Sequence, residues 1–442
     1  MQYLETKKYG IFGLGLTGQS VYQYLNPNEN IICWDDDENT RQNFAKKYSK
    51  CNLVPITAVQ WLQLDEIVIA PGVPHSHMIF AVAKDYNIKI TSDTEIFLSV
   101  HKQKSIIAIT GTNGKSTTTA LIYHLLKSCR LDYVMGGNIG IPLLDLPNAQ
   151  GYILELSSFQ LDLLQEMPFT ISVLLNLTPD HLDRYNNCTD YYQSKLRIFQ
   201  NNSLKIIGID SADSAEYYYT NKDNIDFVAI SSQDVDQKEK YVICTRSEII
   251  DNYFSKQNYP LPSMPNLIGV HNQLNIAAAF AVCKALDIDS KLVINYLPQF
   301  KPLEHRMEYL GVKNGIKYYN DSKATNVSAC ICALSSFSNI YWLAGGIFKE
   351  KNLYELDIYL KNVRIAYLFG QDSNIFAEYL SNKIEYKIFN NMTEAFVQAK
   401  IDAETDKLED AIILLSPACS SFDQFKNFQD RGNNFKKLYD EK

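Results

Sequence analysis

Several features that mark exported, membrane-spanning or metal-cluster proteins are missing from this sequence. No apolar run among its 442 residues approaches the ~18 residues needed to span a membrane. The opening MQYLETKKYG contains no apolar segment of the kind found in export signals. The nine cysteines include no C-x-x-C pair, the spacing typical of zinc and redox sites. We therefore expect a cytoplasmic protein with reduced thiols and no association with membranes.

An excess of basic residues is also missing. The chain carries 42 Lys and Arg against 50 Asp and Glu, which gives a net charge of −8 at pH 7. Nucleic-acid backbones are bound by clustered Lys and Arg, so this balance argues against a nucleic acid as the main partner. A small anionic substrate in a local basic pocket remains compatible with it.

What the sequence does contain is a regular alternation of short apolar runs and helical segments. This alternation predicts an α/β protein with parallel sheets. At about 100–200 residues per domain, the length predicts two or three domains. We expect boundaries near 92–99 and near 298–302, where two prolines interrupt a helical stretch. The predicted strands are Tyr9–Phe12, Ile31–Trp34, Ile67–Ala70, Ser105–Thr110, Tyr152–Leu156, Ile171–Leu177, Ile340–Ala344, Ile365–Phe369 and Ala411–Leu415.

The segment from about Ser203 to Met264 departs from this pattern. It is rich in Tyr, Asn and Asp and shows no clear alternation of apolar runs and helices. We expect it to be an irregular surface elaboration of the middle domain.

Polar clusters follow the predicted strands at one consistent position. GLGLTG, APGVP, TGTNGKST, ELSSFQ, NLTPDH and SPACSSFDQF each begin where a strand ends. In open parallel sheets the ligand crevice lies beyond the carboxyl ends of the strands. The placement of these clusters therefore indicates binding sites, beyond what any single motif indicates.

The stretch ITGTNGKST, residues 109–117, resembles a phosphate-binding loop that lacks a glycine. In the usual G-x-x-x-x-G-K-[ST] pattern, Ile109 stands where the first glycine is expected. The stretch still joins an apolar strand to a predicted helix. Backbone N–H groups and the helix N-terminus can hold phosphate oxygens, Lys115 adds a positive charge, and the Ser116 hydroxyl can reach Mg²⁺. The alternative is an accidental glycine-rich turn.

A second glycine turn, GLGLTG at 13–18, follows the first strand. It fits G-x-G-x-x-G, and Asp35 follows the second strand as the ribose-binding acid of a dinucleotide fold would. Taken alone the turn suggests NAD, but any nucleotide diphosphate would fit it. A purely structural turn stays open as well, and the acidic triplet at 35–37 can be read as a solvated loop.

Candidate metal ligands follow two further strands. Glu155 ends the apolar strand of ILELSSFQL, and Asp180 and His181 follow the next strand. Mg²⁺ prefers oxygen ligands, so Glu155 together with Ser116 is suited to hold one beside the phosphates, and His181 could bind a second ion. The alternative for Glu155 and for Asp180 is a helix N-cap.

With these residues laid out, the chain resembles the Mur ligases of peptidoglycan synthesis. The resemblance runs from Gly13 to Gly432 and is carried by GLGLTG, APGVP, SDTEIF, TGTNGKST, GGNIG, ELSSFQL, NLTPDHLDRY, YYQSKLRIF, HNQLN, EHRME, NDSKATN and SPACSSFDQFKNFQDRG. TGTNGKST is shared with the wider superfamily, which includes folylpolyglutamate synthetases. ELSSFQL, SDTEIF and SPACSSFDQF resemble the branch that adds D-glutamate.

The resemblance implies three domains and a reaction. The expected domains are a Rossmann-like unit for the uridine nucleotide (1–94), a central P-loop ATPase with a mostly parallel sheet (95–299) and a Rossmann-like unit for the amino acid (300–442). The implied activity is ATP-dependent amide synthesis, in which D-glutamate joins the carboxylate of UDP-N-acetylmuramoyl-L-alanine through an acyl phosphate. The implied cofactors are ATP and two Mg²⁺ ions, and we expect a monomer.

The resemblance also implies which residues of this sequence form the site, by their positions in the matching motifs. The catalytic candidates are Lys115, His181, Lys195 and Lys323. The ATP-binding candidates are Gly111, Thr112, Asn113, Gly114, Lys115, Ser116, Thr117, Asn272, Asn275, Arg306 and Asp321. The uridine-substrate candidates are Leu16, Thr17, Asp35, Asp36, Gly72 and Asn138. The D-glutamate candidates are Thr325, Lys349, Ser421, Phe422 and Phe428. The metal candidates are Ser116, Glu155, His181 and Lys195, the last as a carbamate.

Three other functions stay open on sequence alone. GLGLTG with Asp35 suits an NAD-dependent oxidoreductase, although this leaves TGTNGKST unexplained. A non-catalytic nucleotide-binding switch would release phosphate, if any, without an amino acid. A sister ligase that adds another amino acid differs only in its acceptor-side residues. For Lys195 the alternative to a metal-bound carbamate is a surface lysine on an amphipathic helix.

Overall fold

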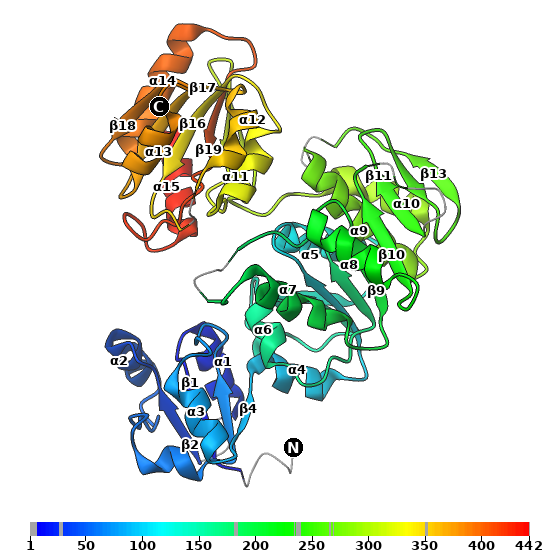
Figure 1. The fold of residues 1–442 in the computed structure, drawn as a ribbon, viewed down its shortest axis with the longest axis vertical. Helices are drawn as coiled ribbons and strands as arrows, with labels where there is room; N and C mark the ends of the chain where they lie inside the picture. Colours follow the sequence, from blue (N-terminus) through cyan, green and yellow to red (C-terminus); the bar gives the residue numbers. More distant parts are fainter. Residues whose placement is uncertain are drawn as a thin grey trace. The chain divides into compact units, whose positions relative to one another are not determined.

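The computed structural model describes residues 7–25, 30–180, 184–233, 235, 240–264, 267, 269–349 and 352–441. Its strands form three sheets of four, nine and six strands (Figure 1). They belong to two compact units, one made of Met1–Cys244, Glu248–Pro260 and Leu274–Tyr296 and the other of Thr245–Ser247, Leu261–Gln273 and Leu297–Lys442. The predicted α/β class with mostly parallel sheets is confirmed. Among the described helices, none has the length and apolar character required to cross a bilayer.

The four-stranded sheet is wholly parallel, with the order β2-β1-β3-β4. Apolar residues on both of its faces are buried under helices, which explains the near-continuous apolar character of its strands. Its elements are β1 (Tyr9–Phe12), α1 (Leu16–Leu25), β2 (Ile31–Trp34), α2 (Glu38–Lys47), η1 (Val59–Gln63), β3 (Glu66–Ile69), α3 (Met78–Asp85) and β4 (Lys89–Thr91).

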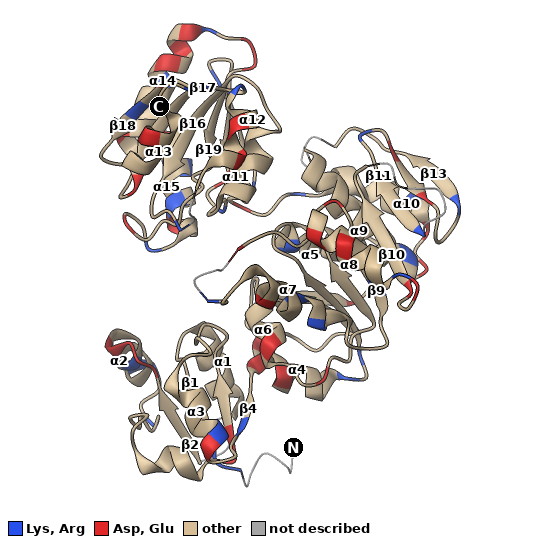
Figure 2. Ribbon diagram, viewed as in Figure 1, with Lys and Arg blue, Asp and Glu red and all other residues tan. Residues whose placement is uncertain are grey.

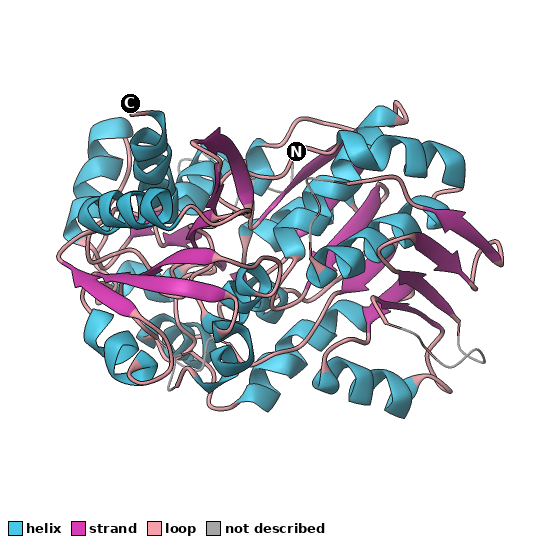
Figure 3. Ribbon diagram, turned by 90° about the horizontal axis from the view of Figure 1, so that it is seen from above, coloured by secondary structure: helices cyan, strands magenta, loops and turns pink. Residues whose placement is uncertain are grey.

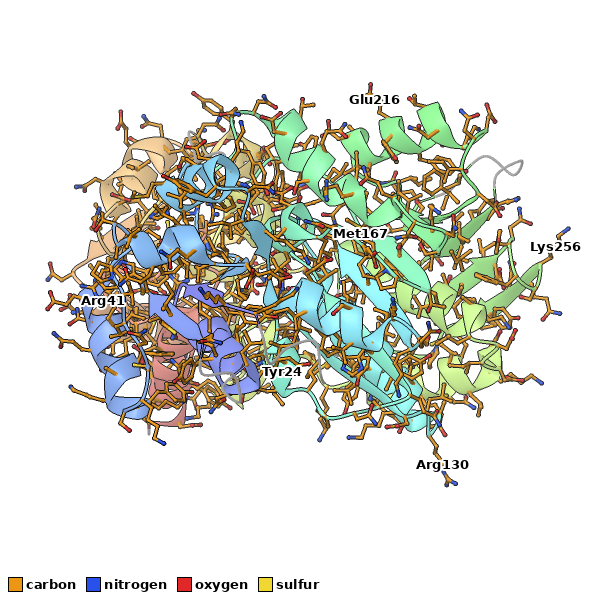
Figure 4. The ribbon with its side chains drawn as sticks, turned by 90° about the horizontal axis from the view of Figure 1, so that it is seen from below. Tyr24, Arg41, Arg130, Met167, Glu216 and Lys256 are labelled. Carbon is orange, nitrogen blue, oxygen red and sulfur yellow. The ribbon has the colours of Figure 1, made fainter. Side chains whose placement is uncertain are left out.

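The nine-stranded sheet has the order β13-β12-β11-β10-β9-β8-β5-β7-β6 and contains the phosphate-loop sequence. Helices lie on both sides of its strands (Figure 3). Figure 4 shows Met167, a core residue, among packed side chains, whereas Arg130, Glu216 and Lys256 point outward. Its elements are α4 (Asp93–His101), β5 (Ser105–Thr110), α5 (Lys115–Ser128), β6 (Tyr133–Gly137), η2 (Leu143–Asp145), β7 (Gly151–Glu155), α6 (Ser158–Leu163), β8 (Ile171–Leu174), α7 (Cys188–Leu196), η3 (Arg197–Phe199), β9 (Leu204–Gly208), α8 (Ala212–Asn221), β10 (Phe227–Ser231), β11 (Tyr241–Cys244), β12 (Glu248–Asp251), β13 (Gln257–Pro260), α9 (Val270–Ala285), α10 (Ser290–Tyr296) and η4 (Leu297–Gln299).

The expectation of an irregular segment at 203–264 was wrong. This segment supplies five strands and a helix, and its first two strands pair in parallel with the rest of the sheet. β10 is buried at every position and β9 at its last three. The final three strands, β11 to β13, form antiparallel pairs at one edge. β11 is buried at every position, β12 alternates between buried and partly buried residues, and β13 has no buried residue. The polar composition of β12 and β13 hides the strand pattern of this edge in the sequence.

The six-stranded sheet has the order β14-β15-β19-β16-β17-β18, and only its first pair is antiparallel. Buried apolar clusters cover both of its faces. Most of the length of its strands carries no charged residue in Figure 2, where Lys, Arg, Asp and Glu lie mainly on helices and loops. Its elements are β14 (Glu308–Lys313), β15 (Ile316–Asn320), α11 (Val327–Leu334), β16 (Ile340–Gly345), η5 (Tyr354–Leu356), α12 (Asp357–Leu360), β17 (Val363–Phe369), α13 (Ser373–Leu380), β18 (Tyr386–Phe389), α14 (Met392–Asp406), β19 (Ile412–Leu415) and α15 (Phe428–Asp440).

Candidate active site

The phosphate-loop sequence forms a tight turn between β5 and α5. Ile109 lies within β5, where it pairs with Glu155 and Val173 on the two neighbouring strands. The turn itself ends at Gly114, whose φ of 85° favours glycine and which caps α5. The N–H groups of a helix's first turn have no intrahelical acceptor, so this end of α5 suits an anion.

Two lysines bring their amines to the backbone of this turn. Lys115 Nζ donates to the carbonyl oxygens of Gly111 (2.8 Å) and Thr112 (2.7 Å). Lys195 Nζ, from α7, donates to the same Gly111 oxygen at 3.0 Å and lies 4.6 Å from the ring centre of Tyr191. Burial, with the nearby charge of Lys115, holds the pKa of Lys195 well below its usual range. Lys195 is only 2% exposed, so the interpretation as a surface lysine was wrong.

Glu155 lies at the end of β7 with its carboxylate buried. Asn138 Nδ2 donates to Oε1 at 3.3 Å, whereas Oε2 is buried without a hydrogen-bond partner among the described residues. The N-cap of the following helix is Ser157, so the alternative that Glu155 caps it was wrong. A buried carboxylate oxygen that accepts no hydrogen bond from the described residues is suited to act as an oxygen ligand of Mg²⁺. Ser116, the other predicted ligand here, is buried at the start of α5.

Two asparagines fix the turn from neighbouring elements. Asn275, on α9, accepts a hydrogen bond from Thr118 Oγ1 at 3.0 Å, and a Cβ at Gly114 would lie 2.6 Å from its Oδ1. Asn176, just after β8, accepts from the N–H groups of Thr112 (3.1 Å) and Asn113 (2.9 Å). The sequence predicted Asn275 but missed Asn176, whose only signal was its place in NLTPDH.

The glycine turn after β1 is organised by a carboxylate. Gly13 has a φ of 93°, and Asp35 Oδ2 accepts from Leu14 N–H at 2.7 Å. The acidic triplet is more than a solvated loop, since Asp36 Oδ2 lies 2.9 Å from His77 Nε2 and Asp37 caps α2. Arg41, labelled in Figure 4, lies 4.3 Å from the ring centre of Trp34.

In the other unit, the end of the six-stranded sheet holds a buried acid. Asp321 accepts from Ser416 Oγ at 2.9 Å and from Met307 N–H at 3.1 Å. Burial raises the pKa of Asp321 to about 7. An acid in this state can exchange a proton near neutral pH.

Arg431 is a buried cation in the same unit that the sequence did not predict. Its guanidinium donates to Ser322 Oγ (3.0 Å) and to the carbonyl oxygens of Ser322 (2.8 Å) and Cys419 (3.0 Å). It therefore ties the segment after β15 to the segment after β19. Burial lowers the pKa of Arg431 to about 10, so the side chain stays charged at neutral pH.

The remaining predicted residues differ in exposure. Lys323 Nζ lies 4.0 Å from the ring centre of Phe428, and Ser421 is buried. Phe422 is 65% exposed, and Lys349 is also exposed. His181 lies outside the described residues. Leu16, Gly72 and Asn138 are exposed, Asn272 is buried, and Thr17, Thr117, Arg306 and Thr325 are partly buried.

Comparison with known proteins assigns the family. Residues 7–92 match the family described as "Mur ligase MurD-like, N-terminal domain", and residues 109–283 match the Mur ligase middle domain. A UDP-N-acetylmuramoylalanine–D-glutamate ligase from Rickettsia bellii is 43% identical over 97% of this chain and 96% of its own length. This chain belongs to the Mur ligase family. The ligase of the same name from Rickettsia felis is 43% identical over 98% of this chain and 96% of its own.

A solved structure agrees at the level of the fold. The MurF ligase from Thermotoga maritima, determined in complex with ADP, superposes with a TM-score of 0.62 at 16% identity, covering 100% of this Mur ligase and 99% of that chain. The predicted resemblance and the three-domain Mur ligase architecture are thus confirmed. Membership of this family rules against the oxidoreductase and the non-catalytic switch.

Proposed function

We propose that this chain joins D-glutamate to the carboxylate of UDP-N-acetylmuramoyl-L-alanine, with cleavage of ATP to ADP and phosphate, in peptidoglycan precursor synthesis. The observation that carries the proposal is the near-full-length similarity to ligases of that name, at 43% identity. The TGTNGKST turn supports it, because a strand, a turn and a helix N-terminus with the Lys115 amine at the turn suit a triphosphate.

ATP would bind at the end of β5 with its phosphates on the turn. Lys115 would clamp the terminal phosphates, and the first turn of α5, with Ser116 and Thr117, would hold phosphate oxygens. Gly111 to Gly114 would line the same site. Asn275 would keep the adjacent helix in register with the loop, and Asn272 lies one turn earlier on that helix. Arg306 and Asp321 would act on the adenosine side.

Mg²⁺ would be held by Ser116 and Glu155, and a second ion by His181 and a carbamate of Lys195. When bound, the metal would neutralise charge on the transferred phosphoryl group. Carbamate formation needs a neutral amine, which attacks CO₂, forms an N–C bond and releases one proton. The lowered pKa of Lys195 supports this step because it favours the neutral amine.

The two other substrates would bind at separate sites, the uridine substrate near the glycine turns and D-glutamate at the six-stranded sheet. Leu16, Thr17, Asp35, Asp36, Gly72 and Asn138 would bind the uridine substrate. D-Glutamate would bind through Thr325, Lys349, Ser421, Phe422 and Phe428. Lys323 and His181 would stabilise charge as the amide forms.

The reaction proceeds in two displacements. A carboxylate oxygen attacks the γ-phosphorus and ADP leaves, which gives an acyl phosphate. The amine of D-glutamate then attacks the acyl carbon, phosphate leaves, and the amine loses a proton. Orientation of the reactants contributes on the order of 7–11 kcal/mol, whereas a single donor contributes about 3–4 kcal/mol. Positioning by the loops therefore outweighs any one side chain.

We further propose that the enzyme is a cytoplasmic monomer acting on small molecules, without a nucleic-acid or membrane partner. The test of the activity is phosphate release with UDP-N-acetylmuramoyl-L-alanine and ATP. D-Glutamate is compared with L-glutamate, L-lysine, meso-diaminopimelate and L-alanine. Release that requires D-glutamate supports the proposal, and release with another amino acid alone indicates a sister ligase.

A further inference from the structure

The phosphate loop of this chain is shorter than the usual pattern. Ile109, at the position of the missing glycine, is a buried strand residue paired on both sides. The backbone can therefore turn only between Gly111 and Gly114. A turn this short has few of its own groups to hold it open, so its conformation depends on a neighbouring element.

Asn176 supplies that support from the end of β8. Its Oδ1 accepts from two successive N–H groups, Thr112 at 3.1 Å and Asn113 at 2.9 Å, and its Nδ2 donates to Asn113 O at 3.1 Å. Its own carbonyl oxygen accepts from Thr112 N–H at 3.2 Å. One side chain thus binds both the N–H and the carbonyl oxygen of Asn113 and fixes the direction in which the loop leaves β5.

The neutrality of this side chain suits the site. Aspartate would accept the same two N–H groups but would add a negative charge beside the phosphates that the loop is proposed to bind. An amide holds the loop without that repulsion. The third hydrogen bond, which Nδ2 donates to Asn113 O, is one that aspartate cannot make.

We propose that Asn176 is the positioning residue that sets the backbone of this loop for the nucleotide. The inference rests on the proposed function, because its ligand is the nucleotide of that reaction. Asn176 acts through the backbone of residues 112 and 113, so its loss should weaken nucleotide binding without affecting the uridine substrate.

The experiment measures binding of ADP and of the uridine substrate separately by calorimetry, on the full chain. Asn176→Ala loses three side-chain hydrogen bonds, so the Kd for ADP is expected to rise about 10-fold to 100-fold. The Kd for the uridine substrate should not change. Asn201→Ala is the matched control, since Asn201 also accepts from a backbone N–H (Ser203, 2.7 Å) and donates to a carbonyl (Ile198, 2.8 Å), in the loop that precedes β9.

Each outcome decides the matter. ADP binding by Asn176→Ala at the wild-type level overturns the role of Asn176, as does an equal loss in Asn201→Ala or an equal loss of both ligands. Wild-type protein that does not bind ADP overturns the proposed function as well. If Asn176→Ala does not fold, Asn176→Asp is used. This variant keeps both contacts to backbone N–H groups but places a negative charge beside the phosphates. Because salt screens that repulsion, its affinity for ADP should fall most at low ionic strength. An affinity equal to that of the wild type at all ionic strengths overturns the proposal.

Discussion

The two glycine turns of this molecule share a backbone plan and differ in the side chain that holds them. Each follows the first strand of its sheet in sequence, contains a glycine with a φ near 90°, and leads into a helix. A residue from the end of an adjacent strand holds each turn through backbone N–H groups. That residue is Asp35 for the turn after β1 and Asn176 for the turn after β5.

This difference in charge indicates which ligand group each turn can accept. At the turn after β5 the holding group is neutral and the Lys115 amine lies at the backbone, so the local charge favours phosphates. At the turn after β1 the holding group is a carboxylate within an acidic triplet. Carboxylates accept hydrogen bonds from hydroxyl groups, so this turn suits the ribose of a nucleotide. The side chains, more than the glycines, therefore separate the two sites.

The largest expected effect removes the positive charge that distinguishes the two turns. Lys115→Ala should lower the rate of phosphate release by about 100-fold to 1,000-fold, as expected for losing a donor to a developing charge. Binding of the uridine substrate should be retained. Lys127→Ala, at the other end of the same helix, is the control and should behave as wild type. Unchanged turnover in Lys115→Ala would contradict the assignment of the phosphate site.

The second expected effect concerns the other lysine at that turn. The pKa of Lys195 is depressed, so the neutral amine that reacts with CO₂ becomes available as pH rises through this lowered pKa, well below the range of an exposed lysine. Activity should fall when CO₂ is removed and return with bicarbonate. Lys195→Ala should lose on the order of 100-fold in rate, equal to removal of one stabilising group.

The carbamate has a direct signature. Protein equilibrated with ¹³C-labelled bicarbonate should show a carbamate carbon resonance that is absent in Lys195→Ala. Lys205→Ala is the control, because the Lys205 amine also donates to backbone carbonyls and its pKa is also lowered by burial. A resonance that disappears in the control, or none in the wild type, would argue against a carbamate at Lys195.

The sequence predicted these turns well because their signals are local. The strand at Ser105–Thr110, the turn and the start of α5 all lie within a dozen residues, and the structure reproduces that strand residue for residue. β8 was predicted to reach Leu177 but ends at Leu174. The next two residues still bond to the neighbouring segment through their backbone, since Leu175 N–H donates to Thr110 O at 3.0 Å and Asn176 O accepts from Thr112 N–H at 3.2 Å.

What the sequence could not predict depends on distant partners. Asn176 contacts a loop that lies 63 residues away in the chain, and Arg431 contacts Ser322 across 109 residues. Neither residue stands in a spacing pattern that implies its contact. The strands of 203–264 were missed for another reason, since the short apolar runs of β9 to β11 are separated by segments rich in Tyr, Asn and Asp and are followed by the polar strands β12 and β13. The burial of Arg431 and of β9 to β11, and the contact of Asn176, are properties of the folded chain and cannot be read from local sequence.

The third expected effect tests how the turn after β1 is built. A Cβ at Gly18 would overlap the carbonyl oxygen of Gly13, whereas a Cβ at Gly15 meets nothing within 4 Å. Gly18→Ala should therefore lower the free energy of unfolding by about 1–3 kcal/mol, the usual cost of overpacking, and Gly15→Ala should change it little. Urea unfolding of the two variants compares them directly. Equal stability would mean that α1 can shift away from the turn.

The smallest expected effect neutralises the group that holds the turn after β1. The Asp35 carboxylate accepts hydrogen bonds from Leu14 N–H and from Asp37 N–H. In Asp35→Asn the single amide oxygen can accept only one of them, the NH₂ group faces the second N–H, and the negative charge is lost. The KM for the uridine substrate should rise about 10-fold, the scale of one charge-assisted hydrogen bond. ADP affinity should not change, because Asp35 holds the turn after β1 and not the one after β5. Asp37→Asn keeps an N-cap of α2 and should leave both constants unchanged; a fall in ADP affinity in Asp35→Asn would mean that the two turns do not act separately.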